Sequence, residues 1–588
     1  MSSSSYSLRA HAIESLTQVK RPNVPWRVVV RNTAAVVLPL AVGMATGHQT
    51  IGLAVASGAL NAMFSDQPGP YRQRLRQLLL NALAAGLASL AGFLLGDHLL
   101  PLLAITAALG FFGGLLVVFG PDTARAGMTS MILLVITAAS PQPLAGALGG
   151  AALIFSGGLL LAAFSLAAWP LQRYWPERHA LVEVYRGLAM LARETRHDAS
   201  DVPALTEAMT SLQQTLLGRH RAHGRAMEAF GVLLELAERI RLELTAIAEL
   251  HAGPVLQAGF RDAASEVLAA IADALEHGDS PARADTLLHA LRARHDEGDG
   301  LAPHRHALLG QLAAAVRNAD WAGSRGELRA SAAETRLPST LRSAPIRATL
   351  RASLTPRSVA FRHAVRMAVC LAATLALSRW LHLPHGYWLP MTAAIVLRAD
   401  FAATFNFGLL RVLGTVLGLV LTTVLLSVTP DQPWAHLALM AVLCMAFRYL
   451  AAAHYGIAVA ALTGTVVILL SFEGVAPDAA VLDRVINTAL GCGIALLAYV
   501  AWPTWERSRA RDALAGMLDA YADYLDHLAG CGGVVRGEIR SAARTARINA
   551  QASIERMRSE PATPPALLTL ARQLLANGNR LARTAMTL

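Results

Sequence analysis

Long apolar runs alternate with polar segments along the chain. Measured against the roughly 20 residues that a membrane-spanning helix needs, these runs predict six spans in a first block and six in a second. They lie near residues 27–46, 50–64, 75–96, 99–119, 124–140 and 144–168, and near residues 359–381, 385–398, 408–428, 434–450, 453–472 and 484–502. The pattern therefore predicts an all-α membrane protein with two repeated six-helix transmembrane halves, each followed by a cytoplasmic helical domain.

The polar segments also have helical periodicity. Between 227 and 248, apolar residues recur at helical spacing between charged positions, which is typical of a helix packed on a partner. The expected order is an N-terminal cytoplasmic segment (1–26), a first transmembrane half (27–170), a cytoplasmic helical domain (171–322), an arginine-rich linker (323–357), a second transmembrane half (358–503) and a C-terminal cytoplasmic helical domain (504–588). The linker favours contact with anionic lipid over nucleic acid, because no aromatic residues are interleaved with its arginines.

The two apolar blocks resemble each other in their arginines. Arg27 and Arg31 recur as Arg362 and Arg366 at one constant separation, and Arg76 recurs at the same separation as Arg411. Asp66 lies one step from matching Asp400, and Trp169-Pro170 at the end of the first block is repeated as Trp502-Pro503. Because each block has an even number of spans, both copies have the same orientation, and the symmetry axis is expected along the membrane normal.

The orientation follows from the basic residues of the short loops, which are retained on the cytoplasmic side. With the N-terminus inside, the inner loops hold most of the arginines, while the outer loops hold little beyond Arg379 and Arg484. We therefore expect a multi-pass protein of the bacterial inner membrane with both termini and both long polar regions in the cytoplasm.

Composition supports a membrane protein and excludes several other classes. Only 15% of the residues are charged, with a net charge of +11, which is too few charges to cover a soluble protein of 588 residues. The four cysteines are widely scattered, so neither a disulfide framework nor a thiolate metal site is predicted. Lys20 is the only lysine and follows no glycine-rich loop, which excludes a P-loop nucleotide site. We predict no cofactor and no enzymatic activity.

Two short spans are the best candidates for a transport site, since irregular backbone at membrane depth is tolerated only beside a cavity. The spans near 50–64 and 385–398 are too short to cross as straight helices, and we expect them to face each other at the centre. The polar residues that follow complete the candidate site, namely Asp66 and Arg76 in the first half and Asp400 and Arg411 in the second.

These residues allow two interpretations. Arg76 and Arg411 are either cytoplasmic anchors with a carboxylate partner or receptors for a substrate carboxylate, which binds arginine through a forked pair of hydrogen bonds. Tyr387 and Trp388 offer aromatic faces to a substrate ring, although Trp388 also suits a position in the interfacial belt.

Four further arginines share helix faces in pairs. Arg27 with Arg31, and Arg362 with Arg366, are spaced four apart and either extend toward lipid head groups or form an electropositive vestibule that concentrates anions. Histidines near the predicted membrane surfaces, including His382 and His385 on the outer side, are candidates for titration near neutral pH.

The second block resembles a known family around its short span. Tyr387-Trp388-Leu389-Pro390-Met391-Thr392, then Asp400, and then Arg411-x-x-Gly414-Thr415-x-x-Gly418 are similar to the fusaric acid resistance protein family of bacterial inner-membrane exporters, as is the whole alternation of spans and polar helices. The resemblance implies export of aromatic carboxylic acids, often beside a periplasmic adaptor protein, with Thr392 and Thr415 joining the candidate site. In the first block, Leu79 and Leu80 stand where Gly414 and Thr415 occur in the second, so that copy of the motif is degraded.

Three functions remain open at this point. The favoured one is a secondary exporter of organic acids driven by the proton gradient or the membrane potential, with membrane lipids, the small organic acid, an adaptor and a second copy of the chain as candidate partners. The alternatives are a gated organic-anion channel and a non-transporting scaffold whose cytoplasmic bundles bind a partner protein.

Overall fold

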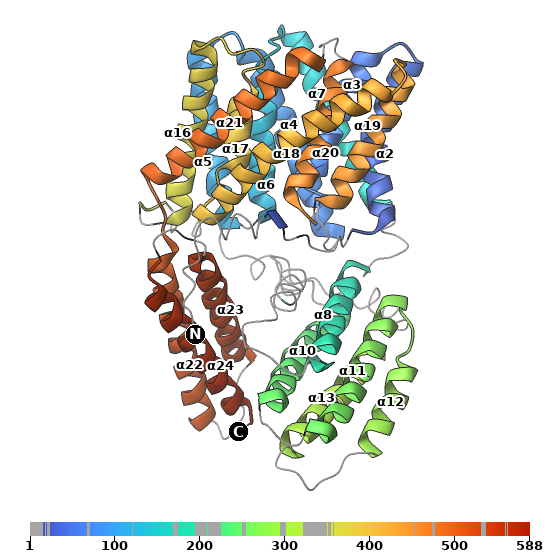
Figure 1. Ribbon diagram of the computed structural model, residues 1–588, viewed down its shortest axis with the longest axis vertical. Coiled ribbons are helices and arrows are strands. Elements are labelled where there is room, and N and C mark those ends of the chain that lie inside the picture. The colour runs from blue at the N-terminus through green and yellow to red at the C-terminus, as the bar shows by residue number, and fades with distance from the viewer. Residues whose placement is uncertain are drawn as a thin grey trace.

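The protein is helical throughout the part that the structure describes. The computed structural model describes residues 16–17, 19, 24–66, 71–119, 121–167, 175–193, 209, 225–249, 254–293, 302–320, 350, 354–356, 358–451, 453–472, 477–530, 537–558, 560 and 563–587. These residues form helices and connecting turns, with no strand (Figure 1). Most of the predicted linker and of the N-terminal segment lie outside these ranges.

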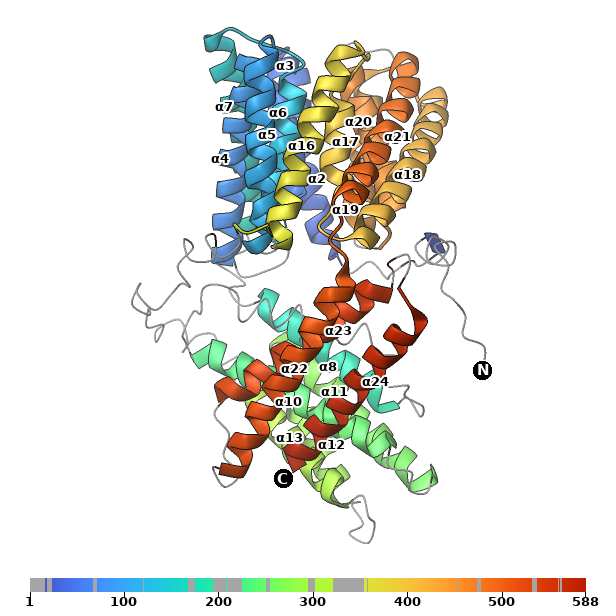
Figure 2. The same ribbon diagram turned by 90° about the vertical axis from the view of Figure 1, so that its left-hand side faces the viewer.

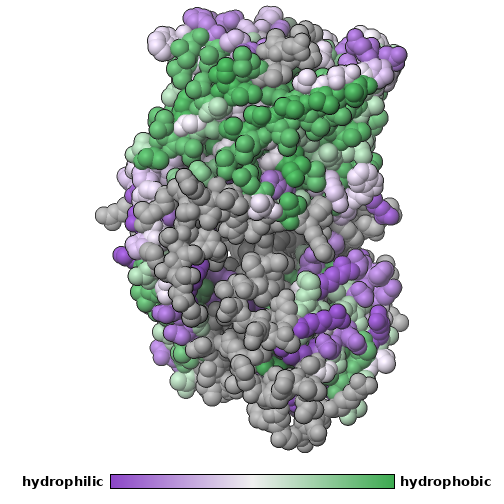
Figure 3. Space-filling model, in the orientation of Figure 1, coloured by the Kyte–Doolittle hydropathy of each residue, from purple (hydrophilic) through white to green (hydrophobic). Residues whose placement is uncertain are grey.

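Twelve α-helices of the described residues form a membrane block, and each predicted span lies on one of them. They are α2 (Trp26–Ala45), α3 (Gln49–Met63), α4 (Tyr71–Leu95), α5 (Leu99–Leu115, extended by the 3-10 turn η1, Leu116–Phe119), α6 (Pro121–Thr137), α7 (Leu144–Leu166), α16 (Val359–Trp380), α17 (Trp388–Val396), α18 (Phe401–Val428), α19 (Pro433–Leu450), α20 (Tyr455–Ser471) and α21 (Pro477–Ala501). Eight described helices are long and apolar enough to cross a membrane, and a broad apolar band crosses the face of the block seen in Figure 3. The chain is a multi-pass membrane protein.

The helices of α2–α7 and those of α16–α21 pack side by side (Figure 2). Helix α5, the fourth helix of the first group, packs along α16, the first helix of the second group. In the reciprocal contact, α2, the first helix of the first group, packs along α19, the fourth helix of the second group. In the same way α6 contacts α17, and buried residues of α3 and α20 share one apolar cluster. Within the groups, α4 packs on α6 and α7 as α18 packs on α20 and α21.

The two short helices do not meet at the centre in the way we expected. Both are short, with 15 residues in α3 and nine in α17. Each packs mainly within its own group, α3 on α2 and α7 and α17 on α16 and α21, while α17 reaches across the interface to α6. The reciprocal contacts explain this arrangement. Helix α17 contacts α6 of the other group, and its counterpart α3 lies near α20, the counterpart of α6, so α3 and α17 have different neighbours.

Close backbone contact fixes α18 against α20. A Cβ atom at Gly418 would lie 2.5 Å from the carbonyl oxygen of Ala460, and one at Gly414 would collide with the carbonyl of Gly456. Small residues four apart let two membrane helices approach to this degree. The glycines of the sequence motif therefore hold α18 in a fixed position.

Two helical bundles lie below the membrane block (Figure 1). The first contains α8 (Trp175–Arg193), α10 (Arg225–Glu249), α11 (Pro254–His277), α12 (Ala282–Ala293) and α13 (Ala302–Asp320), and the second contains α22 (Glu506–Gly530), α23 (Gly537–Arg558) and α24 (Pro565–Thr587). Each has its own apolar core. Glu238 of α10 forms an ion pair with Arg547 of α23 and so joins the two bundles.

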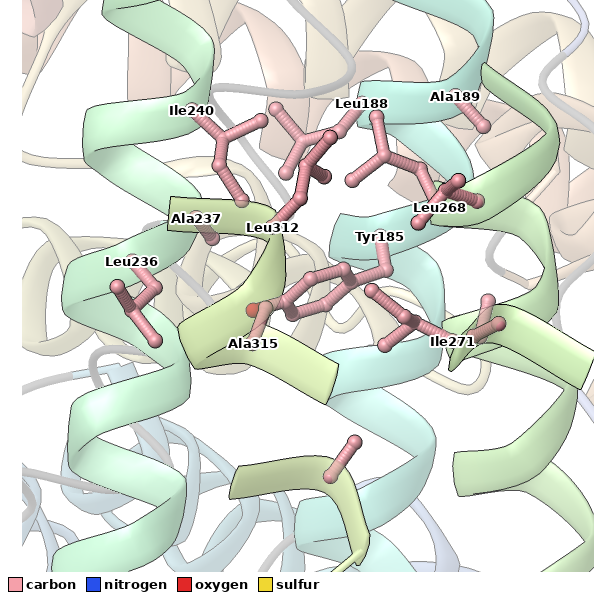
Figure 4. Close-up of a cluster of buried hydrophobic side chains, with 14 of the residues drawn as sticks. Tyr185, Leu188, Ala189, Leu236, Ala237, Ile240, Leu268, Ile271, Leu312 and Ala315 are labelled. Carbon is pink, nitrogen blue, oxygen red and sulfur yellow. The ribbon is translucent and has the colours of Figure 1, made fainter. Parts of the chain in front are cut away.

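Tyr185 lies at the centre of the first bundle, among apolar side chains of α8, α10, α11 and α13 (Figure 4). Its hydroxyl donates a hydrogen bond to the carbonyl oxygen of Leu233 at 3.0 Å. Burial raises the pKa of Tyr185 far above its ordinary value, so the phenol stays neutral. The residue contributes a large apolar surface and one satisfied polar group.

We expect Tyr185→Ala to destabilise the first bundle by about 3–5 kcal/mol, because the substitution leaves a cavity among four helices. Tyr185→Phe, the matched control, keeps the ring and loses one hydrogen bond, at a cost of about 1 kcal/mol. Hydrogen exchange of the α8 and α11 amides in the full-length protein measures both. Equal protection of these amides from exchange in Tyr185→Ala and Tyr185→Phe would show that the ring does not stabilise the core of the bundle.

Candidate anion site

Helix α17 is a broken helix that ends inside the membrane block. It begins at Trp388 with Pro390 in its first turn, where a proline needs no amide partner, and covers only about 13 Å. At Leu397 the backbone leaves the helix, and at Asp400 a new helix starts. All nine residues of α17 are buried, so its side chains face protein on every side.

Helix α18 starts seven residues earlier than the apolar run suggested. The carboxylate of Asp400 accepts a hydrogen bond from the backbone amide of Ala403 at 2.8 Å and caps the helix. Arg411 therefore lies about 15 Å along α18 rather than at its mouth, and it is 3% exposed. Thr415 follows one turn later and is completely buried.

Helix α21 carries an arginine that the sequence analysis misplaced. Arg484 was assigned to an outer loop, but α21 begins at Pro477, and Arg484 is only 2% exposed. Its guanidinium carbon lies 3.4 Å from the centre of the Trp388 ring. Pro477, followed by an acidic residue, is a helix-start signal that could have extended the span to include Arg484.

Three predicted residues of the second half, Tyr387, Trp388 and Arg411, thus lie close to Arg484, whereas Asp400 lies at the start of α18. Trp388 and Thr392 lie one turn apart on α17, Arg411 and Thr415 lie one turn apart on α18, and Arg484 of α21 lies within electrostatic range of both Arg411 and Tyr387. Tyr387 meets Trp388 at a ring-centre separation of 5.8 Å. Cys492, one of the buried cysteines, lies near Arg411 on the α21 side.

The two arginines have no acidic partner among the described residues. The Nε atom of Arg411 and the Nε and Nη1 atoms of Arg484 are buried without a hydrogen-bond acceptor, as are the hydroxyl groups of Thr392 and Thr415. A buried charge costs several kcal/mol unless it is paired, and two like charges close together cost more. The arrangement can bind an anion, which would accept hydrogen bonds from all four groups.

The carboxylate of the first half has a different environment. Asp66 is completely buried and forms an ion pair with Arg74, whose Nε lies 2.6 Å from its Oδ1, while the Asn32 amide donates to its Oδ2 at 2.9 Å. Arg31 lies 3.5 Å from the same oxygen, and Arg448 of α19 donates to the Asp66 carbonyl. Asp66 is therefore a structural centre at the bundle-side end of the first group. Arg76, its expected partner, lies on the exposed face of α4.

The four vestibule arginines are not equivalent. Arg27 is exposed and Arg362 donates to the carbonyl of Pro356, whereas Arg31 donates to the carbonyl of Ser165. Arg366 is 3% exposed. Arg31 and Arg366 thus donate hydrogen bonds to backbone carbonyl oxygens of the fold, and the electropositive vestibule stays a prediction.

Arg366 ties the membrane block to the second bundle. It donates to the carbonyl of Trp502 at 2.9 Å and stacks on Tyr499 at 4.3 Å. The hydroxyl of Thr504, just before α22, donates to the carbonyl of Ala399 at 2.7 Å, at the break after α17. The connection from α21 to α22 is therefore bonded to the break in α17.

Comparison with known proteins confirms the resemblance for the second half. Residues 371–498 match the family model described as fusaric acid resistance protein-like. This segment has the family's pattern and contains the anion site from Trp388 to Arg484. No solved structure matches the chain.

Relatives extend the similarity over most of the chain. It is 24% identical to the uncharacterized protein slr1298 of Synechocystis over 92% of this chain and 78% of that protein. It is 24% identical to the uncharacterized protein YhfK of Escherichia coli over 84% of this chain and 73% of that protein. Inner membrane protein YccS of Escherichia coli is 34% identical over 29% of this chain and 24% of its own length.

Opposite stability effects are expected from two neutralising substitutions. Asp66→Asn leaves Arg74 buried without a counterion and should destabilise the protein by about 3–5 kcal/mol. Arg484→Gln removes an uncompensated charge and should leave the midpoint temperature of thermal unfolding unchanged, or raise it, in anion-free buffer. Thermal unfolding in detergent measures both. A large loss of stability in Arg484→Gln would mean that this guanidinium has a partner within the fold.

Proposed function

We propose that the protein is a secondary transporter that exports organic anions, with aromatic carboxylic acids as the leading substrate class. The observation that carries the proposal is the pair of buried guanidinium groups, Arg411 and Arg484, which have no acidic partner among the described residues. The family match over the same helices supports a transport role, since the family resembled by this segment is one of exporters.

The substrate carboxylate would bind between Arg411 and Arg484 and accept hydrogen bonds from Thr392 and Thr415. A guanidinium group suits a carboxylate because its donors form a planar fork. Tyr387 and Trp388 lie beside this position, and the ring of an aromatic substrate would reach the buried Trp388 once the helices around it separate. Asp66, Asp400 and Arg76 have no part in this proposal.

The same proposal includes an arrangement in the membrane. The chain would consist of two copies of a six-helix unit related by an axis along the membrane normal, which the reciprocal contacts of α5 with α16 and α2 with α19 support. The bundles would lie in the cytoplasm, with the domain boundaries expected from the sequence. The opposite end of the block, referred to below as the outer end, would face the periplasm.

Export of an anion needs no nucleotide. A membrane potential that is negative inside favours expulsion of a monovalent anion by about 2.3 kcal/mol per 100 mV, which supports a gradient of roughly 40-fold. A proton gradient could supply further driving force if proton movement is coupled to transport.

Uptake of labelled benzoate into inverted membrane vesicles tests the function. We expect potential-dependent uptake that falls by at least about tenfold in Arg411→Gln, since one charge-assisted hydrogen bond to the carboxylate contributes about 1.5–3 kcal/mol. Arg27→Gln, which removes an exposed arginine outside the site, should transport normally.

The result also separates the alternatives. Uptake independent of both potential and pH gradient, or equal in Arg411→Gln and Arg27→Gln at equal membrane levels, contradicts the proposal. Single-channel currents carried by benzoate would instead favour a gated channel, and the absence of any flux would favour a scaffold.

A further inference from the structure

The outer ends of α17 and α21 are joined by three contacts from residues 483 to 487 of α21. His385 in the turn before α17 places its Nδ1 atom 3.2 Å from the Oδ2 of Asp483. The next residue of α21, Arg484, stacks on Trp388. One turn further along α21, the amide of Asn487 donates to the carbonyl of Pro384 at 3.2 Å. We name these three contacts the outer clamp.

The turn that carries His385 is conformationally strained. His382 and His385 adopt φ values of 48° and 49°, in the left-handed region that residues with a side chain seldom occupy. Such angles persist only where surrounding contacts hold them. The contact of His385 with Asp483 is one such restraint, and it lies only three residues from Trp388.

We propose that the pair His385–Asp483 is a proton-binding site that controls access to the anion site from the outer end, and this inference rests on the proposed function. A protonated imidazole forms a charge-assisted hydrogen bond with the Asp483 carboxylate, which is roughly twice as strong as a neutral one. Protonation therefore strengthens the outer clamp, and loss of the proton weakens it.

The position of the pair suits this role. The side chains of His385 and Asp483 are 26% and 22% exposed, so water can deliver a proton while the contact remains partly shielded. Histidine exchanges its proton near neutral pH, in the range over which the two sides of a bacterial membrane differ. The residues of the anion site, Thr392, Arg411, Thr415 and Arg484, include no histidine.

The charged groups around His385 are few. Asp483 of α21 contacts the His385 ring, and the neighbouring Arg484 stacks on Trp388. Arg379 at the end of α16 donates to the carbonyl of Ala138 instead. On its own turn, His385 meets the rings of Tyr387 and Trp388, and His382 is exposed. Asp483 is thus the one acidic partner of His385 among the described residues.

Protonation has a consequence for transport through Arg484. While the outer clamp is closed, the guanidinium of Arg484 remains on Trp388, and α17 remains against α21 on the outer side of the anion site. Acid on the outer side therefore stabilises the state closed to that side, and the weakened clamp of neutral His385 permits opening.

Thiol labelling of Cys492 tests the outer clamp without a transport substrate. A full-length variant with Cys370, Cys444 and Cys531 replaced by alanine retains Cys492 near Arg411. A small methanethiosulfonate reagent is added to the outer side of right-side-out vesicles between about pH 8 and about pH 5.5, the range of histidine titration. His385→Asn removes the titrating group and tolerates the left-handed backbone.

We call the variant that retains only Cys492 the parent. Dividing its rate of Cys492 labelling by the rate in the same variant with His385→Asn removes the pH dependence of the thiol itself. We expect this ratio to fall by about fivefold as the pH decreases, since a difference of about 1 kcal/mol changes an equilibrium by that factor. Asp483→Asn should abolish the fall in the same way. His382→Asn, with the same backbone angle and no such partner, should reproduce the parent.

A ratio that stays constant across the pH range, or a His382→Asn variant that behaves like His385→Asn, overturns the proposal. Benzoate efflux from the same vesicles distinguishes the two levels of inference. If no benzoate moves but the labelling ratio still falls, the proposed function fails while the proton site remains supported; if benzoate moves and the ratio is constant, the proton site alone fails.

Discussion

The membrane block is organised around positive charge buried without a matching negative charge. Arg411 and Arg484 lie among apolar helices, and the fold supplies neither with an acidic partner in the described residues. The helices that hold them are correspondingly rigid, since α18 is fixed on α20 by glycine contacts and α17 is enclosed by α6, α16, α18 and α21. Burial of this kind is costly for folding and favourable for recognition, because any anion that enters relieves an energy already stored in the structure.

In the first group of helices, by contrast, the buried charges are paired. Its buried Asp66 is surrounded by Arg74, Arg31 and Asn32, and each strong charge finds a partner. Arg448 from α19 joins this centre, so the paired charges also bond the two groups of helices together. One group thus supplies a closed, satisfied network for assembly, and the other keeps its donors open for a ligand.

Apolar runs predicted the membrane helices well, because length and hydropathy are local properties of the sequence. The depth of individual side chains was harder to predict. Arg411 and Arg484 were placed near the membrane surfaces because α18 and α21 each begin seven residues before the predicted apolar run, and the acidic residues at the start of α21 interrupt its apolar pattern. The expected partner of Asp66 was likewise wrong, because Arg74 and Arg76 lie two residues apart on α4 and therefore point to different faces of the helix. The short span and the helix after it predicted Trp388 and Arg411, and the family resemblance added Thr392 and Thr415. Arg484 could be recognised only once α21 was seen to pack against α17.

The loss of the glycine and threonine pattern in α4 has a consequence for stoichiometry. Leu79 and Leu80 are 40% and 53% exposed on α4, where the equivalent face of α18 is buried against its neighbours. Gly149 stands in α7 at the position that Arg484 occupies in α21, so the guanidinium pair occurs once in the chain and not twice. The proposed site would therefore bind a single equivalent of anion per chain, with a hyperbolic saturation curve.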